Sequence, residues 1–280
     1  MAKPVVIQIS DTHLMPAGER LYGVLDTEAH LLEALDAVAA AHPDLDVLLL
    51  TGDLSNDGGV DVYRRLRAHV DRFVDATGAQ LVVALGNHDD RADYREGFLG
   101  VERSSTPIDT VLMVDGVRII ALDTTVPGCG YGDIRPEQFD WLRSVLNEPA
   151  ERGTLLAFHH SPMPELQPYY NLMLLRDPER LADIVRGTDV RLIVTGHMHH
   201  AMAGSLGGVP VWTSPVTAYE IDVTGADFVM RGLGTTGYTR IDVTAAGTMH
   251  ANPVPVRTDR SEVVRRTFEP ERWRHIILGP

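Results

Sequence analysis

The stretch "QLVVALGNHDD" (residues 80–90) joins a run of apolar residues directly to an amide, an imidazole and two carboxylates. The run "QLVVAL" predicts a buried strand, because short apolar runs bounded by turn residues are typical of strands inside α/β proteins. Polar groups at the end of a buried strand cost free energy unless a partner compensates them. The stretch therefore predicts an α/β fold with a functional group at the end of a strand.

The segments before this stretch alternate between strand and helix patterns. Two further strands are expected at 4–10 and 46–52, and two helices with helical spacing of apolar residues at 26–42 and 62–78. Pro43 forbids continuation of the first helix, and Gly78 ends the second. Consecutive βα units of this kind predict a parallel sheet.

The segments after it add antiparallel strands and more helices. Asp115-Gly116, within the apolar stretch 111–123, is a strong hairpin signal. Two helices are expected to begin with proline, at 136–146 and 177–187. Further strands are expected at 154–158, 190–196 and 209–214, the last of which begins a β-rich final third. These elements predict a two-sheet sandwich with outer helices.

The composition restricts the class of partner. The chain has 280 residues and a formal net charge of −14, which argues against a surface that binds extended nucleic acid. We expect no membrane span, because no apolar run approaches the required length. Its single cysteine, Cys129, and a first segment without a signal-peptide pattern indicate a cytoplasmic protein.

Polar clusters recur wherever a predicted strand ends. They are "DTH" (11–13), "GD" (52–53), "GNHD" (86–89), "HH" (159–160) and "GHMHH" (196–200). Ligand sites of open α/β sheets lie at the carboxyl ends of the strands, so the five clusters are expected to converge. Residues i and i+2 point the same way in extended backbone, which predicts that Asp11 and His13 reach one ion together, as do His197 and His199. Adjacent residues point apart, so of Asn87 and His88 one would bind metal and the other would face a substrate.

Where two candidates are adjacent in the chain, only one of them is counted, and this gives seven candidate ligands. Seven ligands are too many for one tetrahedral ion and suit two ions bridged by a carboxylate. Nitrogen and oxygen donors without thiolate favour Mn²⁺, Fe or Zn²⁺. A pair of such ions activates a bridging water as hydroxide and stabilises both oxygens of an in-line displacement at phosphorus. The candidates are Asp11, His13, Asp53, Asn87, one of His159 and His160, His197 and His199.

The ordered set D-x-H, GD, GNHD, H and GHxH, which extends from residue 11 to residue 199, resembles the calcineurin-type metallophosphoesterases. The stretches "SDTHLMPAGERLYGVLDT" and "RGTDVRLIVTGHMHH" resemble the bacterial class III cyclic-nucleotide phosphodiesterases in particular, followed by glycerophosphodiester phosphodiesterases. The resemblance implies a four-layer α/β/β/α sandwich of two mixed β-sheets flanked by helices. It also implies a dinuclear centre with the following assignment: Asp53 bridges, Asp11, His13 and His199 bind one metal, Asn87, His159 and His197 bind the other, and His88 is a non-ligand near the scissile phosphate.

The leading hypothesis is metal-dependent hydrolysis of a small phosphodiester, with a cyclic nucleotide as the favoured substrate. Asp53, Asn87 and His88 are the expected catalytic residues, and His88 either protonates the leaving oxygen or orients Asn87. The alternatives are glycerophosphodiester hydrolysis, phosphomonoester hydrolysis and a non-catalytic, metal-bound regulatory role. Relatives that pair suggest a homodimer.

Three further segments have open interpretations. Residues 1–252 are expected to form the catalytic domain, and 253–280 an Arg-rich extension that packs on this domain or on a dimer partner. The stretch 161–175 could form a lip over the substrate, in which Tyr169 or Tyr170 stacks on a base or belongs to the core. Asp89 and Asp90 either orient His88 or stabilise a loop and a helix end.

Overall fold

A computed structural model describes residues 4–279 and begins with the three strands and the two intervening helices expected from the sequence. Strands β1 (Val5–Ile9), β2 (Val47–Thr51) and β3 (Gln80–Ala84) pair in parallel. They alternate with helices α1 (Thr27–Ala41) and α2 (Val60–Thr77), and α3 (Arg91–Tyr94) with the π-helical turn η1 (Arg95–Leu99) follows. The side chain of Asp26 accepts a hydrogen bond from the backbone N–H of Ala29, so it caps the start of α1.

The second sheet is built from the middle of the chain in the order β4-β5-β6-β7-β9-β8. Its central strands are parallel, whereas the outer pairs β4/β5 and β8/β9 are antiparallel. Its elements are β4 (Thr110–Val114), β5 (Val117–Ala121), α4 (Pro136–Leu146), β6 (Thr154–Ala157), the 3₁₀ turn η2 (Pro168–Met173), α5 (Pro178–Val185), β7 (Val190–Thr195), β8 (Met202–Leu206) and β9 (Val209–Thr213).

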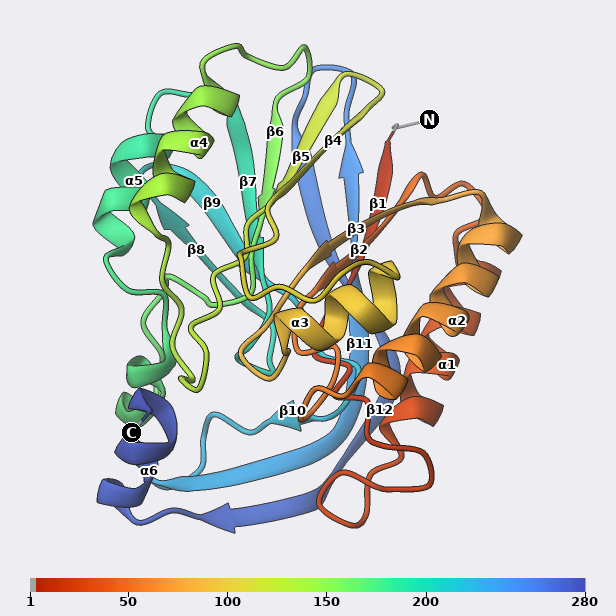
Figure 1. Ribbon diagram of the computed structural model, residues 1–280, viewed down its shortest axis with the longest axis vertical. Coiled ribbons are helices and arrows are strands. Elements are labelled where there is room, and N and C mark those ends of the chain that lie inside the picture. Colours follow the sequence, from red (N-terminus) through yellow and green to blue (C-terminus); the bar gives the residue numbers. More distant parts are fainter. Residues whose placement is uncertain (1–3, 280) are drawn as a thin grey trace.

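The two sheets pack face to face between two helical layers (Figure 1). Strand β2 contributes side chains to both of the layers that cover it. Leu48 and Leu50 belong to the core beneath α1 and α2, whereas Val47 and Leu49 belong to the core between the sheets. A strand buried on both faces needs apolar side chains at consecutive positions. A third core lies beneath α4 and α5. The predicted α/β/β/α sandwich of two mixed sheets is therefore confirmed.

The last part of the chain forms a long ribbon that leaves the first sheet. Strand β10 (Glu220–Ile221) and strand β1 both pair with β11 (Val229–Val243), which also pairs with β12 (Met249–Thr267). The ribbon curves below the two sheets in Figure 1 and ends in α6 (Pro270–Leu278) beside η2. The expected boundary between residues 252 and 253 falls inside β12, so the first part of the Arg-rich extension continues a strand that pairs with β11.

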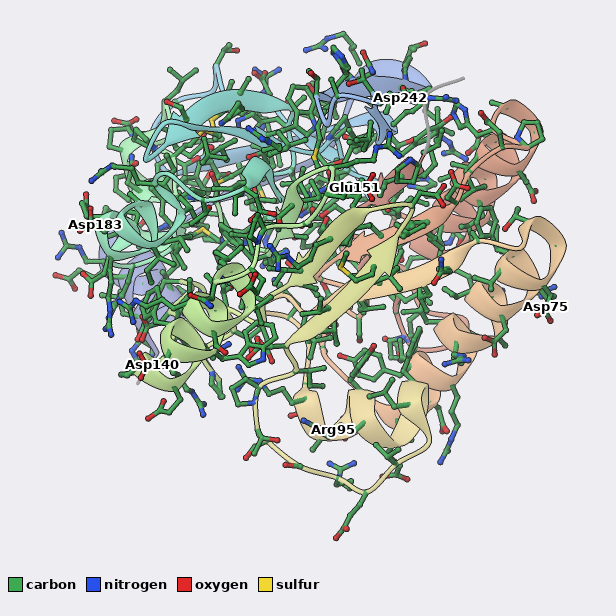
Figure 2. The ribbon with its side chains drawn as sticks, turned by 90° about the horizontal axis from the view of Figure 1, so that it is seen from above. Asp75, Arg95, Asp140, Glu151, Asp183 and Asp242 are labelled. Carbon is green, nitrogen blue, oxygen red and sulfur yellow. The ribbon has the colours of Figure 1, made fainter. Side chains whose placement is uncertain are left out.

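Acidic side chains outnumber basic ones by 39 to 25, and some of them lie on the outside of the helical layers. Asp75 of α2, Asp140 of α4 and Asp183 of α5 are exposed and project from the periphery in Figure 2. These carboxylates are held in solvent, whereas Asp11 and Asp53 are buried at the strand ends. Among residues 4–279, none of the helices has the length and apolar character that crossing a bilayer requires.

Candidate metal centre

The polar clusters that follow the strands meet at one place, where the strand ends of both sheets face the ribbon. Two groups of buried side chains there could each hold an ion, and Asp53 belongs to both. Within each group the possible ligand atoms all lie within 4.8 Å of one another. The first group is Asp11, His13, Asp53 and His199, and the second is Asp53, His159 and His197.

The backbone at these residues is not extended, so the premise that led us to pair residues i and i+2 is wrong. Asp11, His13, Asp53, His197 and His199 all have positive φ, between 43° and 74°. This left-handed conformation is uncommon outside glycine and concentrates at functional sites, where surrounding structure holds it in place. The chain turns sharply at each strand end, and this turn brings the side chains into the centre.

In the first group, side chains from three strand ends surround one position. His13 Nε2 lies 3.0 Å from His199 Nε2 and 3.5 Å from Asp53 Oδ2, and His199 Nε2 lies 3.5 Å from Asp11 Oδ1. Asp11 also accepts a hydrogen bond from the backbone N–H of His197. That bond ties the end of β1, in the first sheet, to the loop after β7, in the second.

In the second group, His159 Nε2 lies 3.3 Å from Asp53 Oδ2 and 3.1 Å from His197 Nδ1. The same oxygen of Asp53 therefore contacts a histidine of each group. A carboxylate oxygen in this position is suited to bridge two cations. His160, the alternative candidate, belongs to neither group, and its Nδ1 bonds to Thr124 Oγ1 at 2.8 Å.

Each of the four histidines uses its other ring nitrogen to donate a hydrogen bond to a carbonyl oxygen, which determines its tautomer. The acceptor of His159 Nδ1 is Thr51 O, and that of His197 Nε2 is Met173 O. His199 Nδ1 donates to Tyr219 O at 2.9 Å. His13 Nδ1 donates to the side-chain oxygen of Asn56, and the amide nitrogen of Asn56 bonds to Asp57, which fixes the amide orientation.

The nitrogens that face the centre consequently carry lone pairs in the neutral rings. Two such pairs approach each other, His13 with His199 at 3.0 Å and His159 with His197 at 3.1 Å. Facing lone pairs repel unless a cation lies between them, and these pairs are oriented as metal ligands. The residues present therefore fit two metal ions.

The pKa values of the buried side chains also favour metal binding at this site. Burial lowers the pKa of His13 and His197 well below the usual range, so both rings are neutral, as metal ligands must be. Burial also opposes a charge on His159, but the carboxylate of Asp53 raises the pKa of His159 to about 9. Burial would raise the pKa of Asp53, but His159 and His88 lower it, so Asp53 is ionised. The centre thus presents anionic Asp53 to the bare nitrogens of His13 and His197 and to His159, whose proton a bound cation would displace.

Asn87 and His88 lie beside the two groups and line the same cavity as Asp53. The Oδ1 atom of Asn87 is buried and has no hydrogen-bond partner among the described residues, a costly state that a metal ion would relieve. His88 is exposed, and its Nδ1 donates to the backbone oxygen of Asn56 at 2.7 Å. Its Nε2 is the ring nitrogen left for a substrate.

Asn56 is a residue that the sequence analysis missed. Its side chain orients His13 and its backbone oxygen orients His88, so one residue positions two members of the site. The only hint of this role in the sequence is that Asn56 lies three residues after Asp53, in the polar loop "GDLSND". The orientation of both rings depends on loop geometry that residue types alone do not specify.

Asp89 joins the two loops that carry Asp53 and Asn87. Its carboxylate accepts hydrogen bonds from the backbone N–H groups of Leu54, Ser55 and Gly86 and from the hydroxyl of Tyr63. Burial, together with the charge of Asp53, raises the pKa of Asp89 to about 6. Of the two interpretations of Asp89, the structure shows loop stabilisation. Asp90, next in the chain, caps α3 by accepting from the N–H of Asp93.

We expect Asp89→Asn to lower the free energy of unfolding by about 3 kcal/mol, because an amide group would turn a donor toward other donors at a buried site. The measurement is urea unfolding at pH 7.5. Asp90→Asn is the matched control, since asparagine caps a helix as well as aspartate does. Equal stability of the Asp89 variant and wild type would show that these bonds do not hold the loops.

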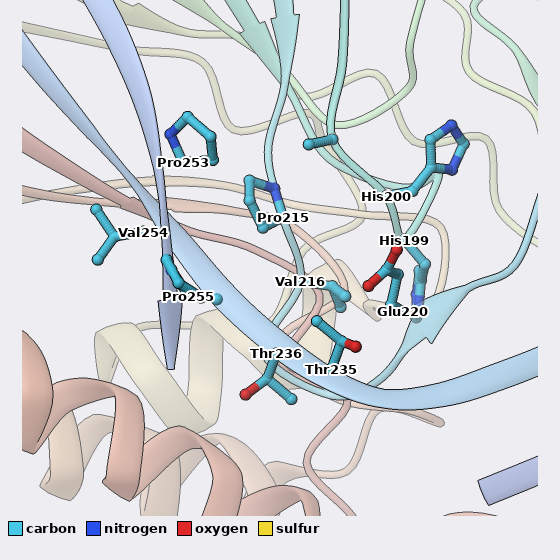
Figure 3. A pocket seen from close by; sticks show the side chains of 12 residues that line it. His199, His200, Pro215, Val216, Glu220, Thr235, Thr236, Pro253, Val254 and Pro255 are labelled. Atoms are coloured by element: carbon cyan, nitrogen blue, oxygen red, sulfur yellow. The ribbon is translucent and has the colours of Figure 1, made fainter. Parts of the chain in front are cut away.

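The centre opens into a cavity of about 380 Å³, within the range of small-molecule sites. Tyr170 and Met173 of η2 line it, and Tyr169 and Tyr170 both belong to the buried cluster around Trp273. A second cavity of about 220 Å³ also touches His199 (Figure 3). Prolines and valines line one side of it, and none of the other candidate ligands reaches it, so the metal chemistry belongs to the first cavity.

The fold and the site together define a class of protein: a phosphoesterase with a dinuclear metal centre at the strand ends of an α/β/β/α sandwich. The comparison with protein families agrees, since the model of the calcineurin-like phosphoesterases matches residues 4–201. The chain belongs to this family, and it is a hydrolytic enzyme, a metal-dependent phosphodiesterase with a dinuclear divalent metal centre.

Two curated relatives are similar over most of the chain. The cAMP/cGMP dual specificity phosphodiesterase of Mycobacterium tuberculosis is 42% identical over 228 residues, which cover 81% of this chain and 72% of that protein. The 3′,5′-cyclic adenosine monophosphate phosphodiesterase of Pseudomonas aeruginosa is 31% identical over 231 residues, 82% of each chain.

Among solved structures, a purple acid phosphatase of yellow lupin (Lupinus luteus) superposes with a TM-score of 0.60 at 13% identity. The match covers 94% of this chain and 53% of that chain, so this protein spans about half the length of the plant enzyme. At this identity the likeness concerns the fold alone.

Proposed function

We propose that this enzyme hydrolyses a phosphodiester bond of a cyclic nucleotide. The observation that carries the hydrolytic chemistry is the arrangement of two facing pairs of histidine nitrogens around one shared oxygen of Asp53. The names of the relatives from M. tuberculosis and P. aeruginosa support the substrate class. A cavity of about 380 Å³ next to the centre has the size for a nucleoside monophosphate.

We assign the metal ligands as the resemblance implied. One ion would be held by the first group, and the other by the second group together with Asn87, whose Oδ1 is buried without a partner among the described residues. Asp53 would serve both ions. Oxygen and nitrogen donors without a thiolate suit Mn²⁺, Fe or Zn²⁺, and elemental analysis of purified protein identifies which of them is bound.

When bound, a pair of divalent ions lowers the pKa of water and neutralises negative charge on a phosphoryl group. The chain itself supplies the proton for the leaving oxygen. His88 donates through Nδ1 to Asn56 O, which leaves Nε2 facing the cavity as the atom that carries this proton. The backbone N–H of His88 donates to Asp53 Oδ1 at 2.9 Å and sets the distance between this imidazole and the centre.

We also propose that the enzyme is a homodimer and is located in the cytoplasm. We expect two copies to pair, because β4 is an edge strand on which Val111 and Met113 are 43% and 54% exposed. The single cysteine, Cys129, supports a cytoplasmic location.

A panel of substrates tests the function. On one Mn²⁺-loaded preparation, we expect the highest kcat/KM for a 3′,5′- or 2′,3′-cyclic nucleotide, with lower values for glycerophosphodiesters and phosphomonoesters. The reason is that the cavity beside the centre is mainly aromatic and apolar, which suits a base better than glycerol. A preference for glycerophosphodiesters or monoesters would replace the cyclic nucleotide as the substrate and leave the metal chemistry in place.

A further inference from the structure

The wall of the substrate cavity opposite the metal ligands comes from the last part of the chain. Arg266, Phe268 and Trp273, at the end of β12 and in α6, line the cavity together with residues of the metal centre. In Figure 1 the ribbon and α6 lie below the strand ends, which places this wall across from them. The family match stops at residue 201, so the wall lies outside the part of the chain that defines the family.

The wall is joined to the metal centre through Tyr219. Its backbone oxygen accepts the hydrogen bond from His199 Nδ1, and its ring lies 4.5 Å from the ring of His199. The hydroxyl of Tyr219 bonds to that of Tyr22 at 3.0 Å, and the two rings meet edge to face. Tyr219 and Tyr22 therefore link the metal centre to the side of the cavity on which the wall lies.

Arg266 adds a cation to this aromatic surface. Its guanidinium lies over the ring of Tyr22 at 5.1 Å and over that of Phe268 at 5.8 Å. Within residues 4–279 no carboxylate pairs with Arg266, whereas its neighbour Arg265 is paired with Glu262. In a chain with a net charge of −14, an arginine without a carboxylate partner that lines a substrate cavity is available to a ligand.

Phe268 is held in place from behind. Its ring lies 4.3 Å from that of buried Trp273, whose Nε1 donates to the backbone oxygen of Tyr169 in η2. Trp273 also packs edge to face on the ring of Tyr169 at 5.5 Å. The wall is thus a supported surface and part of a separate apolar cluster, rather than a free chain end.

We propose that this wall binds the base of the substrate, and that Arg266 and Phe268 are specificity-determining residues for a planar heterocycle. The inference rests on the proposed function, since it names the part of that same site that receives the nucleoside. Ring faces stack on bases regardless of sequence, and a guanidinium plane both stacks and donates to ring nitrogens and carbonyl oxygens. A glycerol group would leave these surfaces without contacts.

The test compares Arg266→Ala, Arg266→Lys and Phe268→Ala with the control Arg265→Ala, whose side chain has a partner outside the cavity. Each is assayed on 3′,5′-cAMP and on glycerophosphoethanolamine, a small diester without any planar ring. We expect kcat/KM for cAMP to fall roughly 10- to 100-fold in the Ala variants, while the value for the small diester changes less than about twofold. Arg266→Lys should lose most of the same preference, because lysine lacks the planar group.

Two results would overturn the proposal. Equal losses on both substrates would mean that the wall only supports the metal centre, and unchanged values on both would mean that it does not touch the base. Competitive inhibition by AMP and by ribose 5-phosphate separates this proposal from the proposed function. If the wild type cleaves the small diester but no cyclic nucleotide, the proposed substrate is wrong. In that case the wall is still supported as a base site if AMP inhibits at least about tenfold better than ribose 5-phosphate and Arg266→Ala removes this difference. It is overturned if AMP and ribose 5-phosphate inhibit the wild type equally.

Discussion

Asp53→Asn is expected to lower kcat/KM for a phosphodiester by at least about a thousandfold, because the metal pair supplies most of the rate enhancement. The Oδ2 atom of Asp53 lies 3.5 Å from His13 Nε2 and 3.3 Å from His159 Nε2, so it is the atom that the two groups share. The change removes the negative charge that both groups of possible ligands share. Metal content, measured by inductively coupled plasma mass spectrometry, should fall below two ions per chain.

Asp140→Asn provides the control for this experiment. Asp140 is exposed on α4 and pairs with Arg143 of the same helix, so its replacement should leave turnover and metal content unchanged. Wild-type activity in the Asp53 variant, or two ions per chain in it, would contradict the assignment of Asp53 as the bridge.

His88→Ala is expected to reduce kcat for cAMP by about 10² to 10⁴, the usual contribution of a positioned proton donor. Two ions should stay bound, because His88 belongs to neither ligand group. The loss should be much smaller for bis(p-nitrophenyl) phosphate, since p-nitrophenolate leaves without protonation. The measurements are kcat on both substrates and metal content for the same protein batches.

The control for His88 is His250→Ala, an exposed histidine on β12. Loss of metal from the His88 variant would make His88 a structural part of the centre. An equal loss of kcat on the two substrates would mean that His88 stabilises the transition state by its charge. It would then not be the group that protonates the leaving oxygen.

The fold was largely predictable, because its information is local. Strand β2 is buried at every position and apolar at the first four of its five, a pattern typical of a strand covered on both faces. The helices carry their own start and stop signals in Asp26 and Gly78. The order of the strands was not predictable. Pairing between β1 and β11 joins residues more than two hundred positions apart, and the apolar pattern of either strand fits many neighbours.

The candidate centre was predictable from a different kind of signal. Polar groups placed directly after apolar strands are costly, so their positions in the chain already indicate a shared partner. The predicted backbone direction was wrong, because Asp11, His13 and three of the other candidate ligands adopt left-handed φ values that a strand pattern does not reveal. Residue types also left His159 and His160 equivalent, whereas in the structure only the ring of His159 approaches Asp53.

The sequence by itself determined the kinds of atoms in the site: carboxylate, amide and imidazole ligands without thiolate, in an order that indicates two metal ions. The tertiary structure decided which nitrogen of each histidine faces the centre, and which residues enclose the substrate. Asn56, Tyr219 and Arg266 act through contacts between segments far apart in the chain. Such contacts depend on how loops and the curved β11–β12 ribbon close over the strand ends, a geometry set by packing of the whole chain and not by any local pattern.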